Sequence, residues 1–191
     1  KDFIQGTSNY ATHLALNYKG KPYIGIVLIP EKNELWISSG KKVWCERKSK
    51  IDLNHNLSKN KNLKNMTIVT SKNHRNIALK KLIDKIGFNK VIVMGSIGCK
   101  IASILRGESD IYICLSLPSK SCPKDWDFAA PEAILKAAGG SITNIDNEEL
   151  NYGEADFEQD GIIVASSDKK LHAKICLEIK DIIRKNDLYP L

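Results

Sequence analysis

The chain has 191 residues, of which 42% are hydrophobic and 27% are charged, and its formal net charge is +7. These values are typical of a globular protein with a buried core, and no apolar run approaches the roughly 20 residues of a membrane-spanning helix. The five cysteines form no CxxC pair, which argues against a disulfide framework and against a structural zinc site. The basic balance favours anionic partners, with solubility alone as the alternative explanation.

The first part of the chain has the pattern of short antiparallel strands. Four strands are predicted there, at residues 12–16, 23–29, 34–38 and 42–45. The chain does not begin with Met and runs almost directly into the first strand, so we expect further residues upstream. We assign residues 1–48 to the last strands of an antiparallel sheet and residues 49–64, rich in Asn and Lys, to a connector.

From residue 65 to residue 191, strands and helices alternate, which predicts an α/β unit with helices packed on a mixed sheet. Strands are predicted at 66–70, 91–94, 111–115 and 161–165, and the apolar run at 91–94 is expected to be buried. Helices are predicted at 73–86, 97–106, 126–138 and 169–185. Glycine follows three of these helices directly, as is usual where a helix ends.

The first candidate for chemistry is a carboxylate at the start of a predicted helix. Asp127 lies at or near the helix N-terminus, where the unpaired N–H groups and the helix dipole stabilise negative charge. Mg²⁺ prefers carboxylate oxygen and usually shares its coordination with a substrate phosphate. Asp127 is therefore a candidate metal ligand beside a phosphate, and an ordinary helix cap is the alternative.

Two further polar segments follow predicted strands. Gly95 to Lys100 supplies two glycines that allow close backbone approach, the Ser96 hydroxyl and the Lys100 charge, which suit a phosphate ester. The spacing is not that of a Walker loop, and an ordinary turn is the alternative. Ser71 and His74 follow the preceding strand, where Ser71 could instead cap the helix. Successive strand ends would bring these groups to one sheet edge, where open α/β sheets bind ligands.

A family resemblance rests on a longer motif. The segment Trp126-Asp127 with Ala129 to Gly140 resembles the second signature of the inositol monophosphatase superfamily, most like its 3'(2'),5'-bisphosphate nucleotidase (CysQ-type) branch. The opening Lys1 to Ile4 resembles the residues that follow the family's first signature, Asp-Pro-Leu-Asp-Gly-Thr, which this sequence does not contain. The resemblance implies an α/β (α+β) fold, the αβαβα layered sandwich of sugar phosphatases, here without its N-terminal helices and first strands.

The resemblance also implies roles for individual residues. Asp127 corresponds to a metal-binding Asp that also contacts substrate. The positions that correspond to nucleotide-binding residues are Ser71, His74, Ser96 and Lys100. The family's other metal carboxylates have no counterpart in this sequence, so no catalytic residue is assigned. An Arg that some relatives carry before the Trp-Asp motif is absent too, which leaves the 5'-phosphate contact unassigned.

The implied activity is Mg²⁺-dependent hydrolysis of the 3'-phosphate of adenosine 3',5'-bisphosphate, with 3'-phosphoadenylyl sulfate as a second candidate substrate. One alternative is an inositol monophosphatase or inositol polyphosphate 1-phosphatase. An alternative of another class is a non-catalytic basic module that binds nucleotide or RNA. We expect a cytoplasmic monomer or homodimer whose partner is a small phosphorylated nucleotide, with neither a membrane nor a nucleic acid as partner.

Overall fold

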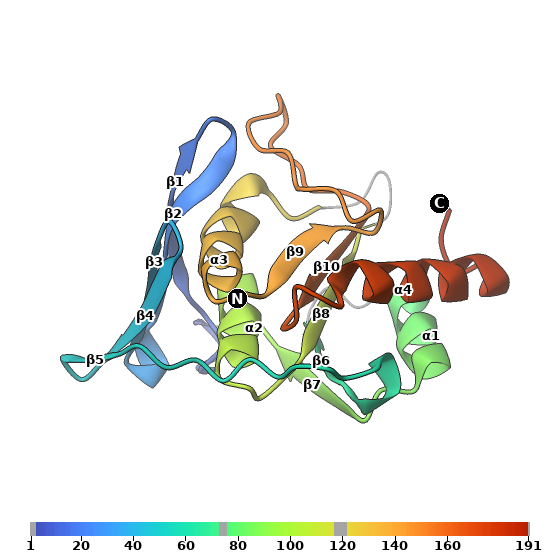
Figure 1. The fold of residues 1–191 in the computed structure, drawn as a ribbon, viewed down its shortest axis with the longest axis horizontal. Helices are drawn as coiled ribbons and strands as arrows, with labels where there is room; N and C mark the ends of the chain where they lie inside the picture. The colour runs from blue at the N-terminus through green and yellow to red at the C-terminus, as the bar shows by residue number, and fades with distance from the viewer. Residues whose placement is uncertain (1–2, 73–75, 117–121, 191) are drawn as a thin grey trace.

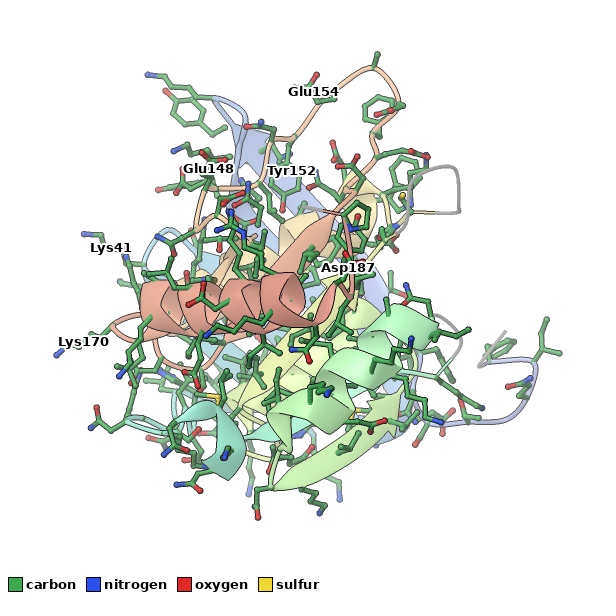
Figure 2. The ribbon with its side chains drawn as sticks, turned by 90° about the vertical axis from the view of Figure 1, so that its right-hand side faces the viewer. Lys41, Glu148, Tyr152, Glu154, Lys170 and Asp187 are labelled. Atoms are coloured by element: carbon green, nitrogen blue, oxygen red, sulfur yellow. The ribbon has the colours of Figure 1, made fainter. Side chains whose placement is uncertain are left out.

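The computed structural model describes residues 3–72, 76–116 and 122–190. Within these ranges the chain forms two five-stranded sheets and four α-helices, arranged in alternating layers (Figure 1). Charged side chains such as Lys41 and Lys170 project from the surface (Figure 2). No helix in the described ranges is long and apolar enough to cross a membrane.

The first sheet is an antiparallel meander. Its strands, in sheet order, are β1 (Thr12–Tyr18), β2 (Lys21–Ile29), β3 (Glu34–Ser39), β4 (Lys42–Arg47) and β5 (Lys50–Asp52). The four strands predicted from alternating apolar residues are confirmed. The fifth pairs with β4 and lies inside the segment assigned to a connector, where the polar sequence Lys50-Ile51-Asp52 carries little strand signal.

Both faces of this sheet carry apolar side chains. On the inner face Val27, Trp36 and Cys45 are fully buried in a core shared with α2 and α3. On the outer face, Leu14 of β1 pairs with Ile26 of β2, and Ile26 pairs with a residue of β3. Leu14 is 65% exposed. A sheet that is apolar on both faces is typical of one covered on both sides.

The second sheet is mixed. Its strands are β6 (Thr67–Ser71), β7 (Lys90–Met94), β8 (Ile111–Leu115), β9 (Ser141–Asn144) and β10 (Ile162–Ser166), in the sheet order β7-β6-β8-β10-β9. Strand β6 is parallel to β7 and β8, so the carboxyl ends of these three strands meet at one edge, as expected. The strand expected at 91–94 is confirmed as β7, but its expected burial is wrong, because β7 is an edge strand and Val91 and Val93 point to a face that solvent reaches.

Two helices separate the sheets and two cover the far side. Helices α2 (Ile97–Leu105) and α3 (Asp125–Ala137) share one core with both sheets. Helices α1 (Ile77–Ile86) and α4 (His172–Asn186) pack on the other face of the second sheet (Figure 1). The order of layers is sheet, helices, sheet, helices, which matches the expected sandwich without an outer helical layer on the first sheet.

The start of α1 differs from the expected start at residue 73. Asn76 caps the helix, since its side chain accepts a hydrogen bond from the Leu79 N–H at 2.8 Å. Ser71 is therefore not the helix cap but the last residue of β6. The error arose because Ser, Asn and Thr are all strong cap residues, and several of them occur in this segment.

Candidate functional site

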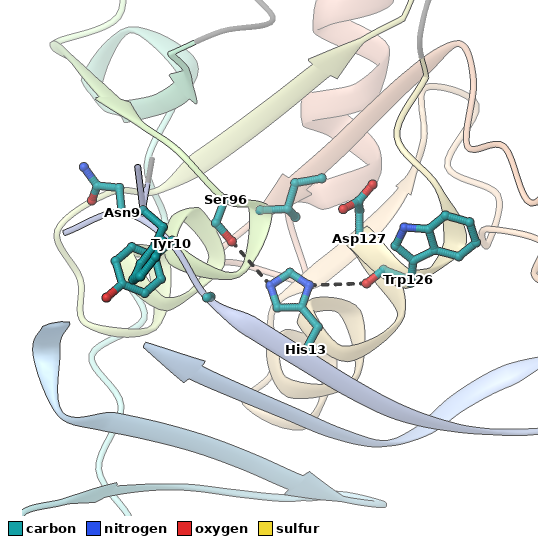
Figure 3. Close-up of a pocket in the computed structure, with 9 residues that line it drawn as sticks. Asn9, Tyr10, His13, Ser96, Trp126 and Asp127 are labelled. Carbon is teal, nitrogen blue, oxygen red and sulfur yellow. Dashed lines mark hydrogen bonds between the residues drawn. The ribbon is translucent and has the colours of Figure 1, made fainter. Parts of the chain in front are cut away.

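A cavity of about 410 Å³ opens where β1 meets the N-termini of α2 and α3 (Figure 3). Its polar lining consists of Asn9, Tyr10, His13, Ser96 and Asp127. The cavity lies beyond the carboxyl end of β7, which runs through Gly95 and Ser96 into α2. Residues at the N-termini of two helices line this cavity, and the positive ends of the helix dipoles suit an anion.

Asp127 combines the two roles that its sequence position suggested. It is the third residue of α3, and its Oδ2 accepts a hydrogen bond from the Lys124 N–H at 2.9 Å, while its own N–H donates to the Lys124 carbonyl at 2.8 Å. Among the described residues, its Oδ1 accepts no hydrogen bond, and Asp127 lines the cavity. One oxygen thus caps the helix and the other is available to a ligand.

Ser96 directly precedes α2 and faces a histidine from the other sheet. The Ser96 Oγ lies 3.4 Å from Nε2 of His13, and Nδ1 of His13 lies 3.3 Å from the Trp126 carbonyl oxygen (Figure 3). Because a carbonyl only accepts, we assign the proton to Nδ1, which leaves Nε2 to accept from the Ser96 hydroxyl. The imidazole therefore links the two segments that carry Ser96 and Asp127.

His13 was missed in the sequence because its partners are 83 and 113 residues away. The signal that could have found it is strand alternation: Leu14 and Leu16 point outward from β1, so His13 points inward. Burial lowers the pKa of His13, and Lys100 adds to this effect, while the Trp126 carbonyl and the Asp127 charge oppose it. The free protein therefore favours a neutral imidazole.

Ser71 and Lys100 are both buried, and neither lines the cavity. The Lys100 ammonium stands 5.1 Å from the centroid of the Tyr112 ring. Burial raises the pKa of Tyr112 far above its usual value, and the Ser71 hydroxyl beside it opposes the rise. The nucleotide contacts assigned to Ser71 and Lys100 stay predictions, and His74 lies outside the described residues.

The described residues supply one ligand position for Mg²⁺ rather than a complete site. Asp127 is the one carboxylate in the described lining of the cavity. The described ranges also hold no group of three or more His, Cys, Asp or Glu side chains placed to bind a metal ion. A single carboxylate with an oxygen free of hydrogen bonds suits a metal that is shared with a phosphate, because Mg²⁺ keeps most of its other positions for water and substrate.

Three relatives among curated proteins are bisphosphate nucleotidases by name. CysQ of Escherichia coli (strain K12), a 3'(2'),5'-bisphosphate nucleotidase, is 24% identical over 155 residues, which are 80% of this chain and 58% of the relative. The 3'(2'),5'-bisphosphate nucleotidase 1 of Dictyostelium discoideum is 23% identical over 89% of this chain and 57% of its own. That of Mus musculus is 33% identical over 46% of this chain and 27% of its own. The chain thus spans a little over half the length of the first two relatives.

Solved structures share the fold. An inositol monophosphatase from Zymomonas mobilis superposes with a TM-score of 0.75 at 21% identity, covering 94% of this chain and 66% of that one. CysQ from Bacteroides thetaiotaomicron gives a TM-score of 0.72 at 21% identity, covering 88% and 67%. The model for the inositol monophosphatase family matches residues 1–184. With nearly its whole length matched, this chain belongs to the inositol monophosphatase family.

Proposed function

We propose that the protein is a Mg²⁺-dependent 3'(2'),5'-bisphosphate nucleotidase that removes the 3'-phosphate of adenosine 3',5'-bisphosphate. The observation that carries the proposal is that Asp127 and Ser96, from two different helix N-termini, line one cavity. The names of the curated relatives support the choice of substrate. The net charge of +7 would favour the approach of a multiply charged anion.

The chain's own contribution is binding and orientation. Asp127 Oδ1 would hold one Mg²⁺ beside the phosphate, and the bound metal supplies charge neutralisation and a nucleophilic hydroxide. The N-termini of α2 and α3 stabilise the charge of the phosphate. The buried charge of Lys100 acts on His13 in the cavity lining and adds positive potential there, where water screens it little.

Phosphate release from adenosine 3',5'-bisphosphate tests the proposal, measured with the full natural polypeptide, including any residues that precede Lys1. Loss of a side chain that only orients a metal ligand costs about 10–100-fold, so Asp127→Asn, which removes a ligand itself, is expected to lower kcat/KM by more than about 100-fold. Asp84→Asn, on the exposed side of α1, is the matched control and should leave the rate within twofold. An Asp127→Asn rate equal to that of the control would refute the proposed role.

Inositol phosphate is the second candidate substrate, because a structure that shares the fold is that of an inositol monophosphatase. The same assay with inositol 1-phosphate and with 3'-phosphoadenylyl sulfate separates the candidates. We expect the two nucleotides to give the higher kcat/KM. A higher value for inositol 1-phosphate would favour an inositol monophosphatase. No release from any of them, combined with salt-dependent RNA binding, would favour a non-catalytic module.

A further inference from the structure

The imidazole of His13 packs against α2 at a position where the helix has no side chain. Gly98 lies in the first turn of α2, where glycine is less favourable than alanine and so needs a packing reason. A Cβ at this position would lie 2.3 Å from His13 Nε2 and 2.8 Å from Val27 Cγ1. Helix α2 therefore has glycine at the position where the His13 ring packs against it. The ring is held in place by this packing and forms part of the cavity wall.

The hydrogen bonds of the His13 ring determine whether the Ser96 hydroxyl can donate to a ligand or accept from one. With Nδ1–H donating to the Trp126 carbonyl, Nε2 accepts the single proton of the Ser96 hydroxyl. The Ser96 Oγ also has two lone pairs, of which the neighbouring Cys99 thiol can occupy one, and Ser96 lines the cavity. A ligand atom that meets Ser96 without disturbing His13 is therefore a donor.

A phosphate oxygen does not satisfy this requirement. A phosphate dianion only accepts, so it would have to draw the Ser96 proton away from Nε2. That exchange would leave the Nε2 atom of the half-buried His13 without a donor, which is unfavourable. A hydroxyl group of the ligand pays no such penalty, because it donates to Ser96 and leaves the bond between Ser96 and His13 intact.

We infer that His13 and Ser96 form a recognition site for a hydroxyl of the substrate, which in an adenosine 3',5'-bisphosphate is the ribose 2'-hydroxyl beside the scissile phosphate. The inference rests on the proposed function and changes the role expected of Ser96 from a phosphate contact to a sugar contact. His13 is the positioning residue in this site, since it acts through Ser96. Asp127, which directly follows Trp126, remains the group beside the phosphate.

The test compares kcat/KM for phosphate release from adenosine 3',5'-bisphosphate and from its 2'-deoxy form, using the full natural polypeptide. The ratio of the two values should be about 3–10 in favour of the ribonucleotide in the wild type, the size of one hydrogen bond. Ser96→Ala should lower this ratio by about the same factor of 3–10, because it removes the acceptor. Any intrinsic difference in reactivity between the two substrates cancels in this comparison of variants.

Two variants separate positioning by His13 from a general structural role. His13→Phe keeps a ring but removes the acceptor, and Gly98→Ala pushes the intact ring away through its added Cβ. Both should lower the ratio toward 1, while thermal unfolding shows that each variant is folded. Thr12→Val, which removes an exposed hydroxyl from the same strand, is the control and should leave the ratio unchanged.

The outcomes distinguish this inference from the proposed function. Equal rates for the ribonucleotide and the deoxynucleotide in the wild type would overturn the hydroxyl site while leaving the nucleotidase proposal in place. A preference for the ribonucleotide that survives Ser96→Ala would do the same. Release of phosphate from neither nucleotide would overturn both.

Discussion

At the scale of single residues, the buried His172 has a structural role rather than a role in the cavity. His172, the first residue of α4, is 1% exposed, and its ring contacts strands β9 and β10. The Thr143 hydroxyl donates to the Asn144 carbonyl, so it accepts from Nε2 of His172 at 2.8 Å, and the Ser166 hydroxyl donates to Nδ1 at 2.7 Å. Both ring nitrogens are thus satisfied in one neutral tautomer.

This network predicts a dependence of stability on pH. Burial lowers the pKa of His172 from 6.5 to about 4. Between these values the unfolded chain takes up a proton that the folded chain does not, so stability is full above about pH 6.5 and is lost as the pH falls toward about 4. The loss from this one residue is on the order of 3 kcal/mol.

Urea unfolding of the wild type and of His172→Gln at several pH values between 4 and 7 measures this loss. The variant should be less stable near pH 7 and should lack most of the wild-type decline toward pH 4. His55→Gln, at an exposed position in the connector, is the control and should follow the wild type. Parallel curves for the wild type and His172→Gln would contradict the assignment.

The sequence could suggest only part of the candidate site. Asp127 and Ser96 were found because each stands at a helix start, a local pattern that hydrogen-bonding rules describe. His13 was not found because its role depends on a strand of the first sheet packing beside two distant helix starts. The burial of Lys100 and Ser71 also follows from packing of the two sheets around α2, which no local pattern describes.

At the scale of secondary-structure elements, one glycine sets how closely the first sheet approaches α3. A Cβ on Gly25 of β2 would lie 2.6 Å from the Ala130 carbonyl oxygen and 2.7 Å from the Ala133 Cβ. This close packing holds α3, and with it the Asp127 carboxylate, against the inner face of the sheet. The site therefore depends on the contact between β2 and α3.

Gly25→Ala is expected to lower the free energy of unfolding by about 1–3 kcal/mol, because it overpacks this contact. Gly25→Leu should cost clearly more than Gly25→Ala. At Gly20, in an exposed turn, an added Cβ meets nothing within 4 Å, so Gly20→Ala costs only the strain of its left-handed backbone and Gly20→Leu adds little. Urea unfolding of the four variants gives the comparison, and equal size dependence at both positions would contradict it.

Most elements could be predicted from periodicity, and the exceptions have physical causes. Strand β9 was missed because Ser141-Ile142-Thr143-Asn144 holds one strongly apolar residue, and it becomes a strand by pairing with β10. Strand β7 was expected to be buried because its sequence is apolar, but its place at the sheet edge depends on the order of strands. Local patterns therefore predict which segments are strands better than where those strands lie.

At the scale of the whole molecule, a buried ion cluster joins the first sheet to the helical layer. Glu34 of β3 is 5% exposed and accepts hydrogen bonds from Arg47 of β4 at 3.1 Å and from Arg106 at the end of α2 at 2.7 Å. Arg106 also binds Glu108. A buried carboxylate held by two guanidinium groups fixes the orientation of the sheet relative to α2, which keeps β1 and its His13 beside Ser96.

Because the cavity is assembled from several layers, the set of segments that a bound ligand perturbs shows whether it binds there. The three groups of the cavity come from β1, from the junction of β7 and α2, and from α3, so they form a site only in the assembled layers. A ligand that binds there perturbs segments that are far apart in the sequence and close in space. A ligand that binds a basic stretch such as the connector perturbs one continuous segment.

The most direct test of the central claim is a map of amide chemical-shift changes when this chain is titrated with adenosine 3',5'-bisphosphate and Mg²⁺. The claim predicts that the largest changes occur together at His13, Ser96 and Asp127, and that Asp127→Asn removes their dependence on Mg²⁺. Largest changes at residues 53–64, the part of the connector that follows β5, or on the outer face of the first sheet, with the cavity residues unaffected, would contradict it.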